Sequence, residues 1–383
     1  MVRKQFLFFF LTLAIMSIGI IGQYHVLPTN AIFELLVLCT FLFVAKRMCP
    51  SAWLVFSCSL LYLIITLALA KARGIHPVDY FIAYKTFFYL ALLSFFSSKV
   101  LFEEKLLRRF WHILLVLFFI KYVIWIGLGQ EGRPGIFTEN NYEIMFVLLL
   151  GCAIWGFNRS LSLFDWMALG VVTFLSGSRS GVICFLAMFT IFYIKDFGWK
   201  TIIKLLVVAI IAAGVAATFI SRLSGGDIEA IDRVVFFQGF LKAISGWGWQ
   251  EYLIGSQTLT AMPESVCTRL QYYQSLFSAG KPGVCYSVIL HTYLTRAIFD
   301  HGFLGLLFIF LAVNQLLKLS DVSPRARLAC ISILFLNGAS VSSMNSVYAI
   351  VGLIIVMTAL YPERLKYYGS SSAKSARELN AST

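Results

Sequence analysis

The chain has 383 residues, of which 60% are hydrophobic and only 13% are charged, and its mean hydropathy is +0.84. Soluble domains carry about 25% charged residues, so this composition excludes a soluble globular protein and indicates a polytopic membrane protein. The formal net charge of +13 would favour nucleic acid as a partner of a soluble protein. Here we attribute it to basic cytoplasmic loops, and we expect no nucleic-acid partner.

Apolar segments that are long enough, or nearly long enough, to cross a bilayer recur along the whole chain. They predict an all-α polytopic membrane protein with about 12 transmembrane helices. The first segment follows Arg3 and Lys4 as a signal peptide would, but no small-x-small cleavage site comes after it, so we keep it as a span. The expected spans are 5–22, 31–45, 52–70, 80–97, 110–128, 141–157, 162–176, 180–195, 202–220, 294–317, 328–343 and 345–361.

The loop charges predict the orientation of these spans. Lysine and arginine collect in the loops of one side, which the positive-inside rule assigns to the cytoplasm, and both termini fall on that side. Residues 1–368 then form a single transmembrane domain, and 369–383 form a disordered cytoplasmic tail. The opposite side carries one large loop, 221–290, between the ninth and tenth spans.

The large loop contains two kinds of segment. Apolar residues at helical spacing over 228–244 predict a helix lying on the membrane surface. The following segment, 256–286, contains prolines and many hydroxyl side chains and is typical of an irregular lid. Cys267 and Cys285 both lie in this lid. They pair if the loop lies in an oxidising compartment, but their spacing is equally compatible with two free thiols.

Arginines on the non-cytoplasmic side are candidate ligands, because the positive-inside rule should have removed them from there. Arg179 lies in SGSRSG, a turn so tight that it must sit at the membrane boundary, and Arg133 lies in GRPGIFTENN. A guanidinium binds phosphate oxygens bidentately, so these residues and Arg233 predict a site for a lipid diphosphate. The alternatives are a snorkelling Arg179 and a surface charge pair between Arg233 and Asp232.

The stretch LHTYLTRAIFDHGFLG, 290–305, opens a long apolar run, and ionisable residues at the mouth of a membrane helix are presumed functional. We interpret His291 as a general base that takes a proton from a sugar hydroxyl. Gly302 follows eleven residues later and would share the face of His291 on a continuous helix, where it would let a substrate or another helix approach beneath the histidine, whereas His301 falls on another face. Arg296 is either a further diphosphate ligand or the local helical partner of Asp300.

Asn140 and Asn141 begin the sixth expected span. We expect them to contact the acceptor sugar or to support the residues that do. A plain helix cap at Asn140 is an equally good explanation, because asparagine is a preferred capping residue.

No pattern in the sequence predicts a metal or nucleotide site. An outward Asp-x-Asp pair, a histidine-rich cluster and a Cys-x-x-Cys motif are all missing, as are the Walker and Rossmann glycine motifs. We therefore expect neither a metal nor a cofactor.

Three stretches together resemble the superfamily of O-antigen polymerases and O-antigen ligases: GRPGIFTENNYEIMFVLLL, LSGSRSG with its following helix, and IDRVVFFQGFLKAI followed by HTYLTRAIFDHGFLG. The last stretch has a histidine, ten residues and a glycine, as that family's signature does. The resemblance covers most of 130–317. Three departures concern the acceptor contacts more than the reaction: Thr292 replaces a common asparagine, Asn140-Asn141 a Pro-Asn pair, and Phe237 a smaller aliphatic residue.

The resemblance implies a metal-independent, inverting membrane glycosyltransferase of the type C-like class, acting at the periplasmic face of the bacterial inner membrane. It implies His291 as the general base and Arg179 and Arg233 as the diphosphate ligands, with Arg296 and Arg133 as weaker candidates. The implied partners are an undecaprenyl-diphosphate-linked oligosaccharide, membrane lipid and a protein that regulates chain length.

Within that superfamily we expect a polysaccharide polymerase, which transfers the growing chain from its lipid diphosphate to a lipid-linked repeat unit. The first alternative is an O-antigen ligase, which transfers the glycan to lipid A core. The second is a lipid-linked oligosaccharide flippase or transporter, which would place its charges near the bilayer midplane.

Overall fold

The computed structural model describes residues 2–18, 22, 25–44, 48–130, 132–194 and 232–362, without the side chains of 2–4 and 232–233. Most of these residues are α-helical, and their β-structure consists of one isolated bridge between Phe102 and Ala359. The predicted all-α class is therefore confirmed. The expected ninth span, 202–220, the beginning of the large loop and the tail 369–383 lie outside the described residues.

Each expected span coincides with a helix wherever the structure describes it. Four helical segments are long and apolar enough to cross a membrane: Pro50–Ala72, Glu104–Gly127, Asn140–Asn158 and Tyr293–Leu319. They identify a membrane protein by length and composition. The helices of this bundle are α1 (Val2–Ile18), α2 (Thr29–Val44), η1 (Pro50–Ala52), α3 (Trp53–Ala72), α4 (Pro77–Ser94), α5 (Glu104–Gly127), α6 (Asn140–Asn158), α7 (Leu163–Leu175), α8 (Arg179–Tyr193), α13 (Tyr293–Leu319), α14 (Pro324–Gly338), η5 (Ser343–Asn345) and α15 (Val347–Thr358).

The centre of the bundle is formed by α6 and α15. Every residue of α15 is buried, and in α6 all residues except Tyr142 and Asn158 are buried. A helix that is apolar on all sides packs in the middle of a bundle. The two helices approach closely because Gly352 has no side chain: a Cβ atom there would lie 2.6 Å from Leu149 Cδ1.

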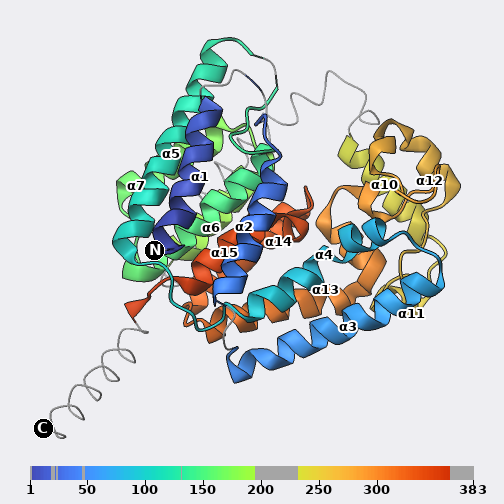
Figure 1. Cartoon of the computed structure of the whole chain (residues 1–383). Helices are drawn as coiled ribbons and strands as arrows, with labels where there is room; N and C mark the ends of the chain where they lie inside the picture. Colours follow the sequence, from blue (N-terminus) through green and yellow to red (C-terminus); the bar gives the residue numbers. More distant parts are fainter. Residues whose placement is uncertain are drawn as a thin grey trace, which may run out of the picture.

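The other helices surround this centre in two groups (Figure 1). Helix α1 packs against α5 and α2 against α15, whereas α3, α4 and α13 pack together at a steep angle to the first group. The first turn of α6, the start of α8 and the start of α13 carry the candidate site residues.

Residues 232–290, which we call the cap, form a separate helical layer beside α3, α4 and α13 (Figure 1). Phe236 and Phe240 pack in the cap's own apolar cluster with Val266 and Leu270. A helix is confirmed for 232–244 of the expected 228–244, but its apolar face packs inside the cap, and its place on the membrane surface stays a prediction. The cap elements are α10 (Asp232–Ile244), α11 (Trp249–Ile254), α12 (Glu264–Arg269), η3 (Gln271–Leu276) and η4 (Ser287–Leu290).

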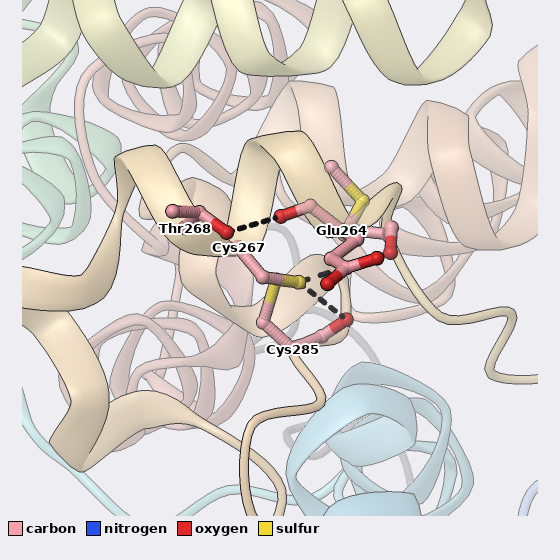
Figure 2. Close-up of a disulfide and its surroundings, with 5 residues drawn as sticks. Glu264, Cys267, Thr268 and Cys285 are labelled. Carbon is pink, nitrogen blue, oxygen red and sulfur yellow. Dashed lines mark hydrogen bonds between the residues drawn. A yellow bond between two sulfur atoms is a disulfide. The ribbon is translucent and has the colours of Figure 1, made fainter.

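The prediction of an irregular lid over 256–286 is wrong for its middle part, where α12 and η3 form. Cys267 on α12 and Cys285 are joined by a disulfide, with their Cα atoms 5.6 Å apart (Figure 2). This bond and the apolar cluster around it order a segment whose prolines and hydroxyl side chains favoured an irregular chain.

The cap contacts the bundle at a close backbone approach. A Cβ atom on Gly302 would lie 2.3 Å from Leu253 O, and Ser256 N donates to Phe299 O at 2.7 Å. Farther along the cap, Asp79 of α4 accepts a hydrogen bond from Ser278 Oγ at 2.6 Å. The cap is thus fastened to both α13 and α4.

The expectation of a continuous helix from His291 to Gly302 is wrong. Helix α13 begins only at Tyr293, and Gly302 breaks it with φ +66° and ψ −175°. Glycine is the residue that adopts such a conformation without strain. Gly302 therefore allows the approach of another helix, α11, which is one of the two expected alternatives, but it does not lie beneath His291 on a continuous helix.

Candidate functional site

The SGSRSG turn is bound to the start of α6. Asn140 Nδ2 donates to Ser176 O at 2.6 Å, and Asn141 Oδ1 accepts from Ser178 Oγ at 2.6 Å and from Ser180 Oγ at 3.1 Å. Both asparagines are buried. Because their amides are engaged with the turn, these residues are placed to support the site from behind, and a direct sugar contact is not favoured.

The helix-cap explanation for Asn140 is wrong. Helix α6 begins at Asn140, and the residue in the capping position is Glu139, with extended backbone angles. Glu139 accepts a hydrogen bond from Asn141 Nδ2. The carboxylate is therefore held next to the asparagine that binds the SGSRSG turn.

Glu143, one turn into α6, holds the preceding loop. Its buried carboxylate accepts backbone hydrogen bonds from Ile136 at 3.0 Å, from Thr138 at 2.7 Å and from Phe137. The role of Glu143 in holding this loop was not among the sequence-based predictions. An acidic residue in the first turn of an apolar helix, directly after a glycine-containing loop, was the available signal.

Arg179 and Arg133 both lie at the SGSRSG turn. Arg179 is the first residue of α8, whose capping residue, Ser178, accepts a hydrogen bond from Gly181 N. A Cβ atom added to Gly177 would lie 3.9 Å from Arg133 Cγ. The two arginines, each half-buried, therefore flank the start of a helix, where the backbone dipole also favours an anion.

His291 is the central residue of a γ-turn between η4 and α13. Its backbone angles are φ +59° and ψ −37°, and Thr292 N donates to Leu290 O at 2.6 Å. This turn is rare and strained for a residue that is not glycine. Strain of this kind persists only where the surrounding structure imposes it, and it is concentrated at functional sites.

The His291 imidazole lies beside the start of α6. Its Nε2 atom is 4.0 Å from Glu139 Oε2, and the two side chains are 38% and 32% exposed. On its other side, the ring of Phe236 from α10 lies at a centroid distance of 5.8 Å. The structure thus brings His291, Glu139 and the arginine-bearing turn together from three distant parts of the chain.

Arg296 supports this arrangement from inside the bundle. Its Nη1 atom donates to Ser342 Oγ at 2.9 Å, and Ser342 Oγ donates to the His291 carbonyl oxygen at 2.9 Å. Arg296 is only 5% exposed. Its guanidinium is therefore placed to hold the His291 backbone, a role different from the two that the sequence offered, a diphosphate ligand or the helical partner of Asp300. Asp300 accepts a hydrogen bond from Ser287 Oγ.

His301 is a packing residue inside the bundle. It is buried, its Nδ1 atom lies 2.9 Å from the Tyr62 hydroxyl, and its ring packs edge-on against Tyr84 and Phe87.

Arg233 cannot be placed at the site in the same detail, because its side chain lies outside the described residues. Its backbone belongs to the first turn of α10, three residues before Phe236.

The described residues contain no group of three or more histidine, cysteine, aspartate or glutamate side chains that could hold a metal ion. What the site offers is an imidazole, a half-exposed carboxylate and two guanidinium groups. In comparisons with known proteins, no family model and no curated protein matches this chain.

Proposed function

We propose that the protein is a polysaccharide polymerase of the bacterial inner membrane, with about 12 spans, both termini in the cytoplasm and its site facing the periplasm. It transfers a growing glycan from undecaprenyl diphosphate to the terminal sugar of a lipid-linked repeat unit, with inversion at the anomeric carbon.

The observation that carries this proposal is the His291 γ-turn beside Glu139. A strained, half-exposed histidine within 4.0 Å of a carboxylate, next to a turn that presents arginines, fits a base poised near an anionic leaving group. The resemblance of the same three stretches to O-antigen polymerases and ligases supports the assignment to glycan transfer.

The proposed reaction forms one bond and breaks one. The acceptor hydroxyl oxygen attacks the anomeric carbon of the donor sugar, the bond from that carbon to the phosphate oxygen breaks, and the lipid diphosphate leaves with the electron pair. His291 takes the hydroxyl proton. The Glu139 carboxylate, 4.0 Å from Nε2, stabilises the imidazolium that results.

The arginines act on the leaving group. Arg179 and Arg133 lie at the turn where α8 begins, and their charges stabilise the diphosphate as negative charge develops on it. Arg233 is proposed for the same task from α10. Arg296, Asn140 and Asn141 hold the catalytic groups in place and make no contact with the diphosphate.

Deletion of the gene followed by gel electrophoresis of the cell's lipopolysaccharide tests the proposal. Core carrying a single repeat unit is the expected pattern. Bare core would identify a ligase in place of a polymerase, and an unchanged ladder would overturn both assignments. Restoration of the ladder by the wild-type gene on a plasmid is the control.

A further inference from the structure

A polar pocket lies close to His291. It has a volume of about 120 Å³ and forms where the first turns of α2 and α6 meet α4 and the turn between α14 and α15. Its lining includes Asn30, Glu34, Lys85, Tyr142, Ser342 and Asn345.

Two residues of the lining connect the pocket to the site. Ser342 Oγ donates to the His291 carbonyl oxygen at 2.9 Å. Tyr142 lies in the first turn of α6, where its backbone nitrogen donates to Glu139 O at 3.1 Å. The pocket therefore adjoins both members of the Glu139–His291 pair.

The charges in the pocket cancel. Lys85 Nζ and Glu34 Oε1 form an ion pair, and the two side chains are 30% and 40% exposed. A diphosphate would gain little from a site with one positive and one negative group, whereas an uncharged polar ligand finds both donors and acceptors.

The amide side chains of Asn345 and Asn30 add further hydrogen-bond donors and acceptors to the pocket. Asn345 Oδ1 accepts hydrogen bonds from Thr86 N at 3.1 Å and from Thr86 Oγ1, which fixes the amide and leaves its Nδ2 group to donate to a ligand. Asn30 is exposed at the start of α2. Sugar hydroxyls donate and accept at once, and these groups match that requirement.

The size of the pocket selects a small ligand. A water in the liquid takes about 30 Å³, so the pocket has room for about four waters, comparable with the hydroxyl-bearing edge of one sugar ring. The polar lining disfavours a lipid tail.

We infer that this pocket binds one uncharged, hydroxyl-bearing sugar ring of the acceptor and thereby presents its neighbouring hydroxyl to His291. The inference rests on the proposed polymerase function and deepens it. Glu34 and Asn30 are assigned as specificity-determining residues for the acceptor, distinct from the groups that bind the diphosphate.

Saturation-transfer NMR on the purified full chain tests the inference. The probe is the repeat-unit oligosaccharide released by mild acid from lipid-linked intermediates of the deletion strain. Protons of one sugar ring should receive saturation in the wild type and in His291→Ala. The signal should fall at least fivefold in both Asn30→Ala and Glu34→Gln. Asn158→Ala, an exposed amide at the far end of α6, is the matched control and should keep the signal.

Absence of signal in the wild type, or equal signals in all of these variants, would overturn the pocket assignment. Asn30→Ala removes only an exposed side chain, so its result stands even if Glu34→Gln perturbs folding. Failure of the polymerase proposal is read separately, from an unchanged lipopolysaccharide ladder in the deletion strain. A normal ladder together with pocket-dependent binding would leave a sugar site in a protein of another function.

Discussion

A histidine lies beside a carboxylate near each end of α6, but the distance and the exposure of the two groups differ between the ends. Near Asn158, His112 Nε2 lies 2.7 Å from Asp165 Oδ1, and that carboxylate is 2% exposed. Near Asn140, His291 Nε2 lies 4.0 Å from Glu139 Oε2, beyond hydrogen-bond distance, and both groups are partly open to solvent.

The surroundings of the two histidines differ in the same way. Arg108 bridges Glu104 at 3.1 Å and Asp165 at 3.3 Å, and Ser162 and Asp165 form a capping box at the start of α7. Charges that satisfy one another fasten α5 to α7. His291 instead sits on a strained backbone with its carboxylate held at a distance. Residue types alone therefore do not distinguish a structural ion pair from a candidate functional site, whereas the geometry around each histidine does.

The largest expected effect distinguishes the two histidines. His291→Ala should reduce polymer formation by about 10²- to 10⁴-fold, the usual contribution of a general base, while expression and thermal stability stay near wild type. His112→Ala should leave polymer formation intact and lower the unfolding free energy by about 1–3 kcal/mol, because the buried Asp165 loses a partner. Gel densitometry measures polymer formation, and thermal unfolding measures stability. Long-chain glycan in His291→Ala would remove this residue as the base.

A mutation that loosens the cap tests whether activity depends on the packing of the cap against His291. Gly302→Ala adds a Cβ atom 2.3 Å from Leu253 O at φ +66°, which should cost about 3 kcal/mol or more and loosen the cap. Phe236 would then leave the His291 ring, and activity should fall. Limited proteolysis of the cap reports the change. Gly246→Ala meets no atom within 4 Å and is the matched control; equal protease sensitivity of both variants would refute this account.

The arginines at the two ends should respond differently to a change that keeps the charge. Arg179→Lys should lose about ten- to a hundredfold in activity, nearly as much as Arg179→Ala, because lysine cannot make the bidentate contact. Arg108→Lys, in a partly exposed ion pair, should cost less than about 1 kcal/mol of stability and leave activity unchanged. Full polymer formation by the Arg179→Lys enzyme would argue against bidentate binding.

Two glutamates four residues apart at the start of α6, Glu139 in the capping position and Glu143 within the helix, provide the finest comparison. Glu139→Gln should lower activity about tenfold through loss of imidazolium stabilisation, with little change in unfolding. Glu143→Gln should lower stability by about 1–3 kcal/mol, because its new amide faces backbone N–H groups of 136–138. If the two variants shift the same property, the division between site and scaffold at this end of α6 is wrong.

The helices and several site positions could be predicted from the sequence because their signals are local. Apolar runs gave the right helices within a few residues wherever the chain is described, and SGSRSG predicted a tight turn, which occupies 176–178. Arg179 and Arg133 stood out because arginine is unexpected on the outer side. Cys267 and Cys285 could be paired only conditionally, since spacing does not determine distance.

The errors arose where distant contacts overrule local pattern. LHTYLTRAIFDHG reads as one helix, but the chain makes a γ-turn at His291, whose carbonyl oxygen is held by Ser342, and a close contact with the cap breaks the helix at Gly302. Arg296 and Asn140 have the chemistry of ligands, yet burial turns them into supports. Glu143 was overlooked because its three partners are backbone groups of the neighbouring loop, which no residue type reveals.

The sequence by itself determined that this is an all-α membrane protein with arginines and a histidine at the mouths of its helices. Apolar helices are readable because the bilayer requires each segment to satisfy its own backbone hydrogen bonds. Only the tertiary structure decided which polar side chains face a ligand. Glu139 meets His291, and Ser342 joins His291 to the polar pocket, through contacts between segments far apart in the chain. Such contacts depend on how the helices pack, and the pattern along any one segment does not contain that information.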